Sequence, residues 1–278
     1  MRKKTAIVTG SSSGFGLLCA VELALKGFTV IATMRDVKKA QLLLELAKER
    51  NIVELIQIHS LDVTSVESIN NLKNSLTNYP SIDVLVNNAG YAFGGFSEEI
   101  SIEEYRQQFE TNFFGVIAVT NAVLPFMRAK RQGRIINMSS ISGRMGFPGL
   151  SAYVSSKHAL EGYSECLRLE LKPFGIDVSL IEPGSYQTNI WTSVDQMKIN
   201  SDSPYCSFMR SLLKEIKNGK AEHGNPIEVA KLIAQITSQK KTPDLRYPIG
   251  KSVKKNLLLK SLLPWKIIEE TVLKRIQQ

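Results

Sequence analysis

Apolar runs of strand length alternate with stretches of helical periodicity along most of the chain. Residues 5–9 read T-A-I-V-T, and after the glycine-rich turn that follows, Phe15, Leu18, Val21 and Leu25 recur at intervals of three or four residues. This change of period predicts a strand followed by a helix. The same pattern predicts further strands at residues 28–34, 52–58, 82–86, 134–138, 177–181 and 245–249. It predicts further helices at residues 36–50, 66–78, 102–130, 151–171 and 227–238.

This alternation indicates an α/β fold, a doubly wound parallel sheet of about seven strands with helices on both faces. Asp36 is expected to cap the helix at 36–50, and Pro125 should break or kink the helix at 102–130. We expect one domain over residues 1–278, because the chain has no internal repeat, low-complexity tract or linker.

Two C-terminal segments depart from the alternation. Residues 185–225 lack a clear strand–helix rhythm and are rich in aromatic residues and methionine, which predicts a lobe that covers a substrate. Those side chains could also simply pack on the domain. Residues 252–278 are expected to form a basic, leucine-rich helical tail interrupted at Pro264.

Glycine and polar residues follow nearly every predicted strand. In a parallel sheet, ligands bind beyond the carboxyl ends of the strands, so these residues should share one site. The features concerned are residues 10–16, 35–36, 62, 88–90, 140 and 183–184. Agreement among six separate positions indicates a site more strongly than any one motif.

The turn at residues 10–16, G-S-S-S-G-F-G, joins the first strand to a helix N-terminus. Backbone N–H groups and the helix dipole make such a turn a binding place for a pyrophosphate. Gly10 permits the sharp turn, Gly14 lets the backbone approach the ligand, and Gly16 allows the helix to pack closely on the strand. The spacing differs from the commoner G-x-G-x-x-G, and such a turn can also merely join two elements; its position favours a nucleotide site.

Tyr153 and Lys157 are four residues apart and lie on one face of the predicted helix, with Cβ atoms ~5–6 Å apart. A phenol has an ordinary pKa of ~10, and a neighbouring cation pulls that pKa toward the range in which acid–base catalysis is efficient. Ser140 stands thirteen residues before Tyr153 and could polarise a substrate oxygen. A lone Tyr-x-x-x-Lys is often one face of an exposed helix, so the pair is informative only beside a nucleotide site.

The composition, 43% hydrophobic and 22% charged, is that of a globular protein with a sizeable core. The three cysteines have no metal-ligand spacing and indicate a reducing compartment. No apolar run is long enough for a signal-peptide core or a bilayer span. We therefore expect a cytoplasmic protein.

The formal charge of +9 is concentrated near the C-terminus, where residues 239–278 hold ten Lys/Arg and three Asp/Glu. We expect no nucleic-acid partner, because the chain lacks zinc-finger spacing, an RNA-binding aromatic motif and a long basic block. The amphipathic tail could rest on an anionic membrane surface. We favour the alternative that its leucines cover the lobe or a second subunit of a homo-oligomer.

These motifs resemble those of the short-chain dehydrogenase/reductase family. The resemblance covers residues 4–188 and rests on T-G-S-S-S-G-F-G, L-D-V, N-N-A-G, E-T-N-F-F-G, I-N-M-S-S, Y-V-S-S-K and P-G-S-Y-Q-T. It implies a Rossmann-like fold and hydride transfer between a nicotinamide and a carbonyl or alcohol carbon. It also implies that Tyr153 is the acid/base, that Lys157 lowers its pKa and holds the nicotinamide ribose, and that Ser140 hydrogen-bonds the substrate oxygen. Asn112 would hold a proton-relay water.

The resemblance further implies a set of cofactor-binding residues. Asp62, Asn88 and Ala89 would contact the adenine and its ribose, and Thr188 would steady the nicotinamide amide. The full set is Gly10, Ser12, Ser13, Gly14, Phe15, Gly16, Arg35, Asp62, Val63, Asn88, Ala89, Gly90, Tyr153, Lys157, Pro183, Gly184 and Thr188.

Alternatives stay open at this point. Asn112 could simply satisfy backbone groups, Ser139 rather than Ser140 could face the substrate, and His158 could be a mere helix neighbour. A cofactor-binding sensor or scaffold without turnover is a second function class, against which Tyr153 and Lys157 argue. Epimerases and dehydratases of related fold usually have a different glycine spacing and a longer chain.

Cofactor choice depends on the residues after the second strand. The strand ends at Met34 rather than at a carboxylate, Arg35 follows, and Asp36 has a capping role, so NADP(H) is favoured over NAD(H). The substrate is expected to be a small lipophilic carbonyl or alcohol compound, and A-T-M-R-D and L-R-Y-P-I-G are similar to hydroxysteroid and retinol dehydrogenases. Apart from Arg144, the residues expected near the site are almost uncharged: Phe93, Phe96, Met145, Phe147, Leu150, Tyr186 and Trp191.

Overall fold

A computed structural model describes residues 3–191, 201–219 and 223–277. Its centre is a sheet of seven parallel strands in the order β3-β2-β1-β4-β5-β6-β7. The predicted α/β fold, with its doubly wound parallel sheet, is therefore confirmed. The strands are β1 (Thr5–Val8), β2 (Thr29–Met34), β3 (Ile56–Ser60), β4 (Val84–Asn87), β5 (Gly133–Met138), β6 (Ile176–Pro183) and β7 (Arg246–Ile249).

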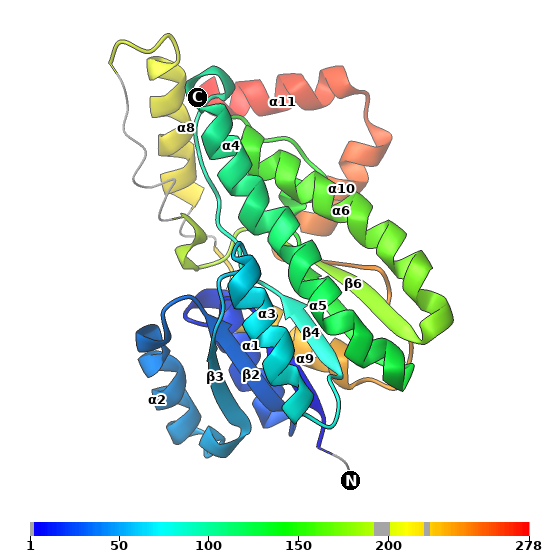
Figure 1. Cartoon of the computed structure of the whole chain (residues 1–278). Coiled ribbons are helices and arrows are strands. Elements are labelled where there is room, and N and C mark those ends of the chain that lie inside the picture. The colour runs from blue at the N-terminus through cyan, green and yellow to red at the C-terminus, as the bar shows by residue number, and fades with distance from the viewer. Residues whose placement is uncertain (1–2, 192–200, 220–222, 278) are drawn as a thin grey trace.

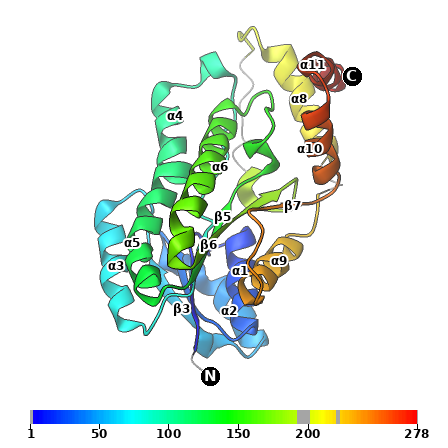
Figure 2. The same ribbon diagram turned by 90° about the vertical axis from the view of Figure 1, so that its right-hand side faces the viewer.

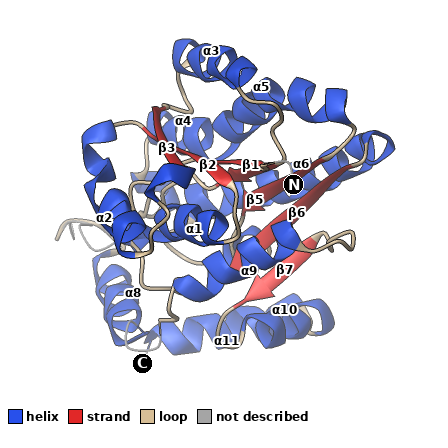
Figure 3. Ribbon diagram, turned by 90° about the horizontal axis from the view of Figure 1, so that it is seen from below, coloured by secondary structure: helices blue, strands red, loops and turns tan. Residues whose placement is uncertain are grey.

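Helices cover both faces of this sheet (Figures 1 and 3). One face carries α1 (Gly14–Leu25), α2 (Gln41–Glu49) and α9 (Ile227–Ser238), and the other carries α3 (Val66–Ser75), α5 (Gly115–Lys130) and α6 (Ser151–Leu171). Each layer buries an apolar cluster against the strands, because the strand side chains point alternately to the two faces. The remaining helices are α4 (Ile102–Phe109), α8 (Cys206–Gly219), α10 (Val253–Leu262) and α11 (Trp265–Gln277).

The strand order reverses between β1 and β4, and a doubly wound sheet binds ligands at this switch point. Parallel pairing aligns the carboxyl ends of the strands: Val8 pairs with Ala32, and Met138 pairs with Ile181. The turns that follow β1, β4, β5 and β6 therefore open at the same edge. Figure 2 shows α8, α10 and α11 beyond that edge, so these helices form the outer wall of any site there.

The main departures from the predicted elements have local causes. The third strand begins at Ile56 rather than residue 52, because Val53–Leu55 form a 3₁₀ turn. Regular helix passes through Pro125, whereas the irregularity predicted there lies upstream, in a π-helical turn at Glu110–Phe114. Such turns are frequent at functional sites, and this one contains Asn112.

The lobe contains a helix that the sequence pattern did not predict, α8, and this helix packs against α11 of the tail. The tail is interrupted at Pro264 as expected, since α10 ends at Leu262 and α11 begins at Trp265. Residues 192–200 and 220–222 of the lobe lie outside the described residues.

By length and composition, one helical run in the described part of the chain, Ile102–Lys130, could cross a membrane. In this fold 44% of its most apolar window is buried, and Val119 and Val123 lie in the core against the sheet. Its apolar character is therefore accounted for by packing.

Candidate active site

A cavity of about 1390 Å³ opens at the carboxyl ends of the strands. Its wall includes Ser140, Tyr153 and Lys157 and every predicted cofactor-binding residue except Gly16. Asn112 is likewise absent from the wall. Residues predicted from six separate strand ends thus converge on one cavity, as the sheet topology requires.

The glycine turn forms one end of the cavity. Gly10 has φ 68°, and Gly14, the first residue of α1, has φ 55°, a backbone region that side-chain-bearing residues rarely adopt. A Cβ on Gly16 would stand 2.3 Å from the carbonyl oxygen of Gly10, so this glycine permits close packing of α1 on the turn. Ser13 precedes the helix without a side-chain capping bond, which leaves the N-terminal N–H groups of α1 available to an anion.

Hydrogen bonds from the turn after β4 brace the glycine turn. Asn88 donates through Nδ2 to the carbonyl oxygens of Thr9 (2.8 Å) and Gly10 (3.1 Å). The Thr9 hydroxyl accepts from the backbone N–H groups of Asn88 and Ala89, both at 2.9 Å. The Asn88 amide group is therefore occupied in shaping the turn, although Asn88 still forms part of the cavity wall.

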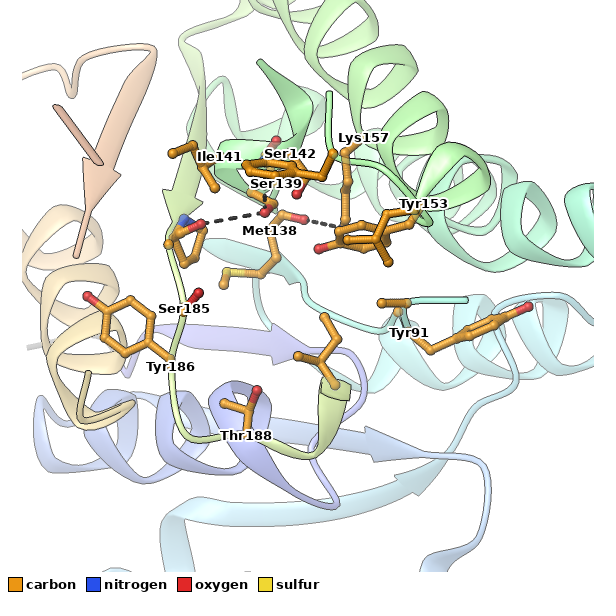
Figure 4. Close-up of a pocket in the computed structure, with 18 of the residues that line it drawn as sticks. Tyr91, Met138, Ser139, Ile141, Ser142, Tyr153, Lys157, Ser185, Tyr186 and Thr188 are labelled. Atoms are coloured by element: carbon orange, nitrogen blue, oxygen red, sulfur yellow. Dashed lines mark hydrogen bonds between the residues drawn. The ribbon is translucent and has the colours of Figure 1, made fainter. Parts of the chain in front are cut away.

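Tyr153 and Lys157 lie side by side in the cavity wall, across from the segment of Ser185, Tyr186 and Thr188 (Figure 4). Both residues are buried, with 6% of each exposed. The Lys157 ammonium donates to the carbonyl oxygen of Met138 at 2.7 Å and lies 5.7 Å from the centroid of the Tyr153 ring. The helical spacing therefore brings the pair onto one face, as predicted.

Burial of the two side chains shifts their pKa values in ways that the four-residue spacing alone did not indicate. Burial raises the pKa of Tyr153 to about 12, and the neighbouring Ser140 hydroxyl acts in the opposite direction. Burial also lowers the pKa of Lys157 to about 8, against the charge of Glu161, which raises it. Burial is thus the largest effect on the pKa of Tyr153, and the expectation that Lys157 lowers this pKa stays a prediction.

The two serines after β5 have different surroundings. Ser139 donates its hydroxyl to the Glu161 carboxylate, behind the site. Ser140 accepts from the Ser142 N–H at 3.1 Å and acts on the pKa of Tyr153. Ser140 is therefore the serine whose hydroxyl is beside Tyr153. His158 is exposed, and its Nδ1 is 2.9 Å from the Val154 carbonyl oxygen, as expected of a helix neighbour.

Asn112 is buried behind the cavity and joins two elements. Its Oδ1 accepts from the Tyr91 N–H (3.1 Å), and its Nδ2 donates to the Tyr91 carbonyl oxygen (2.9 Å) and to the Ser156 hydroxyl (3.2 Å). The side chain thus fixes the loop after β4 against α6. The side-chain amide of Asn112 is therefore occupied in positioning the loop. This arrangement agrees in part with the alternative in which Asn112 satisfies backbone groups.

The end of β2 supplies the cation at the far side of the cavity. Met34 and Arg35 line the wall, whereas Asp36 does not and instead accepts the Lys38 N–H at 3.0 Å as a helix cap. Asp62 also lines the wall, and hydrogen bonds from the N–H and hydroxyl of Thr64 lower the pKa of its carboxyl. The cavity wall thus combines a glycine turn with free N–H groups, a cation and a carboxylate, which fits a nicotinamide dinucleotide.

A family model described as short chain dehydrogenase matches residues 4–199, more than half of the chain. The chain belongs to the short-chain dehydrogenase family. This dehydrogenase is 53% identical over 279 residues, 99% of both chains, to YusZ of Bacillus subtilis, an uncharacterized oxidoreductase. It is 36% identical to 3-ketodihydrosphingosine reductase of Bacteroides thetaiotaomicron, over 90% of this chain and 89% of that one. A solved structure of actinorhodin polyketide ketoreductase with NADPH matches it with TM-score 0.78 and 30% identity, over 90% of this chain and 97% of that one.

The comparisons confirm the predicted family, and the dehydrogenase also has a feature that its motifs did not reveal. A partly buried ionic cluster lies behind Lys157: Arg246 Nε is 2.9 Å from Glu161 Oε2 and 3.2 Å from Glu182 Oε1. Arg144 also reaches Glu182, at 3.3 Å. Burial raises the pKa of the Glu182 carboxyl, and Glu161 adds to this rise. Because β7 and α6 are far apart in the sequence, only their spatial contact could have identified the cluster.

The apolar wall differs in part from the expected one. Met145, Phe147, Leu150 and Tyr186 line the cavity, whereas Phe93 and Phe96 do not. Phe96 stacks on Tyr205 and Phe208 instead, so part of the aromatic content of the lobe packs on the domain. The side chain of Trp191 lies outside the described part of the chain.

The charged residues around the cavity also differ from those expected from the sequence. Arg144 is not part of the wall, because it turns to Glu182. The charged residues of the outer wall are Glu110, Glu215, Lys251 and Lys260. Glu110 is on the π-helical turn, Glu215 is on α8, Lys251 directly precedes the tail and Lys260 is on α10. The cavity therefore has a charged rim around its apolar surface.

Proposed function

We propose that this oxidoreductase transfers hydride between NADP(H) and the carbonyl or secondary-alcohol carbon of a lipophilic substrate. One observation carries the proposal: the Tyr153–Lys157 pair and the Ser140 hydroxyl stand in the same cavity as the open N-terminus of α1 and Arg35. A proton donor, a hydrogen-bond donor and an anion site in one cavity are the groups that this reaction needs.

Each residue has a distinct role in the reduction of a carbonyl. A bound nicotinamide supplies the hydride, and the carbonyl oxygen gains negative charge as the hydride reaches its carbon. Ser140 donates a hydrogen bond to that oxygen, and Tyr153 gives it the phenolic proton. At its raised pKa Tyr153 is protonated near neutral pH, so the proton is present, and the cation of Lys157 favours its release to the substrate oxygen. Lys157 holds the ribose and stabilises the phenolate once the proton has left.

The preference for NADP(H) rests on Arg35. Its guanidinium is suited to a 2′-phosphate, whereas the neighbouring carboxylate of Asp36, which could have bound a free 2′-hydroxyl, is occupied in capping. The similar polyketide ketoreductase was solved with NADPH, which supports the same choice.

A lipophilic substrate suits the wall beside Tyr153. Met145, Phe147, Leu150 and Tyr186 offer no charge to replace the water that a sugar or a carboxylate would lose on binding. The name of the Bacteroides relative gives the 3-keto group of a sphingoid lipid as its substrate, which supports the same class.

The proposal also includes a cell compartment and an oligomeric state. We infer a cytoplasmic enzyme, whose reducing surroundings suit the unpaired Cys19, Cys166 and Cys206. We also infer a homo-oligomer, because Phe114 and Leu169 are exposed apolar residues that are not part of the cavity wall. Sedimentation velocity of the full chain measures the oligomer; a monomer at micromolar concentration would refute that inference.

The direct test is turnover. A panel of ketones and alcohols is assayed with NADPH, NADH and their oxidised forms, and the change is followed at the nicotinamide absorbance. We expect reduction of apolar ketones with NADPH. No turnover of any carbonyl or alcohol, despite tight cofactor binding, would instead support a sensor without chemistry.

A further inference from the structure

The tail has an apolar face that nothing in the described residues covers. Leu262 is 70% exposed and Trp265 60% exposed, and Leu258, Leu263 and Ile267 are exposed beside them. These five residues, here called the tail patch, surround the junction of α10 and α11. Figures 1 and 2 show both helices at the outer edge of the molecule.

The opposite side of the same helices is firmly attached. Val253 and Ile276 are buried, α11 packs against α8, and Lys260 donates to the carbonyl oxygen of Arg144. Ile268 and Val272 line the cavity. The tail patch is therefore not exposed because the tail is loosely attached. The two helices pack on the rest of the molecule through one apolar face and present a second apolar face outward.

The charges around the tail patch are mainly positive, although α11 also carries the exposed Glu269 and Glu270. α10 contains three lysines and no acidic residue, and Lys254 and Lys255 are exposed. Lys254 stands four residues before Leu258, on the same helix face, and Lys266 follows Trp265 directly. An exposed Trp, leucines and flanking lysines are the composition of a helix that lies in the interface of an anionic bilayer.

A second copy of the chain fits this face less well. A two-fold contact places the same surface opposite itself. Because α10 and α11 together carry six Lys/Arg and two Glu, such a contact would bring together two surfaces of net positive charge. An anionic lipid surface has the complementary charge.

We propose that the tail patch docks the enzyme on an anionic lipid bilayer and that the substrate enters the cavity from there. Leu259 and Leu263 are both exposed and part of the cavity wall, so the patch is continuous with the cavity. A lipophilic compound can pass from the bilayer to the cavity along these side chains without crossing water. The substrate route rests on the proposed function, whereas the docking does not.

The test uses the full chain and vesicles of phosphatidylcholine, with or without phosphatidylglycerol. We expect co-sedimentation with the anionic vesicles, weakened at least tenfold by 0.5 M salt. Leu262→Glu with Trp265→Glu should weaken it at least tenfold. Leu42→Glu, at a residue 53% exposed on α2, is the matched control and should not weaken it. Turnover of a water-soluble ketone without vesicles should be equal in all three proteins, because none of the three changed residues lines the cavity.

Three results would overturn the docking: no binding to either vesicle, equal binding to both, or equal binding by the tail variant and the control. The unmodified protein and the control could be dimers in sedimentation velocity while the tail variant is a monomer. That result would assign the tail patch to an interface with a second copy and would also refute the proposal. Absence of turnover by the unmodified protein would refute the proposed function instead, whatever the vesicle result.

Discussion

Glu161 is expected to keep Lys157 charged at neutral pH. The two residues are one helical turn apart on α6, and the Glu161 carboxylate opposes the fall that burial imposes on the pKa of Lys157. Arg246, Glu182 and Arg144 face the same region from β7, β6 and the turn after β5, and Tyr153 faces it from α6 itself. Glu161→Gln removes the negative charge with little change of shape. The pKa of Lys157 should therefore fall below its present value of about 8.

The size of the effect follows from charge and distance. Unit charges about 6 Å apart interact by roughly 3 kcal/mol at an effective dielectric constant of about 20. Arg246 Nε lies 2.9 Å from the same carboxylate and its side chain is 25% exposed, so water and this cation screen the interaction; at an effective dielectric constant of about 40, roughly 1.4 kcal/mol of it is left. The remaining ~1.4 kcal/mol corresponds to about a factor of ten, so NADPH affinity at pH 8 should fall about 3- to 10-fold. At pH 6, where Lys157 is protonated in both proteins, the affinities should agree within about twofold.

The assay is NADPH binding followed by its fluorescence between pH 6 and pH 9.5. In the unmodified protein, affinity should decline as the pH rises through about 8, because the ammonium is lost. The decline should begin at lower pH in Glu161→Gln. Glu165→Gln is the matched control, because Glu165 binds the same Arg246 from a more exposed position. A loss of affinity that is equal at all pH values would refute the electrostatic role and indicate a structural one.

Three further predictions concern the cofactor site and the substrate. Arg35→Ala should weaken NADPH binding by one to two decades, given ~1.5–3 kcal/mol for a charge-assisted hydrogen bond, and leave NADH unchanged; tighter NADH than NADPH binding by the unmodified protein would reverse the assignment. Gly16→Ala should lower Tm and cofactor affinity because the new Cβ meets the Gly10 carbonyl oxygen, whereas Gly162→Ala, with open space around it, should do neither. In a series of ketones, kcat/KM should rise with chain length, and a preference for small charged ketones would contradict the apolar wall.

The parts predictable from the sequence are those that depend on neighbours along the chain. The turn from Gly10 to Gly16 needs particular backbone conformations, and glycines at those positions are visible in the sequence. The four-residue spacing of Tyr153 and Lys157 likewise decides that they share a helix face. Strand ends could be located within a few residues, and parallel pairing then placed them at one edge of the sheet.

The parts that escaped prediction depend on tertiary contacts. Arg246 reaches Glu161 across 85 positions of sequence, and no local pattern indicates this pair. The raised pKa of Tyr153 follows from burial, which the helix spacing could not reveal. The π-helical turn was not predicted either. The sequence shows Pro125 as a helix breaker, whereas the turn contains Asn112, whose side chain is held by tertiary hydrogen bonds to Tyr91 and Ser156.

The central claim is that Tyr153 moves the proton while other residues hold the cofactor. The decisive measurement compares Tyr153→Phe with the unmodified protein, by NADPH fluorescence for binding and by ketone reduction for turnover. The ring remains and only the hydroxyl is lost, so NADPH affinity should stay within a few-fold while turnover falls by about 10²–10⁴-fold. Turnover near that of the unmodified protein would contradict the assignment of Tyr153 as the acid.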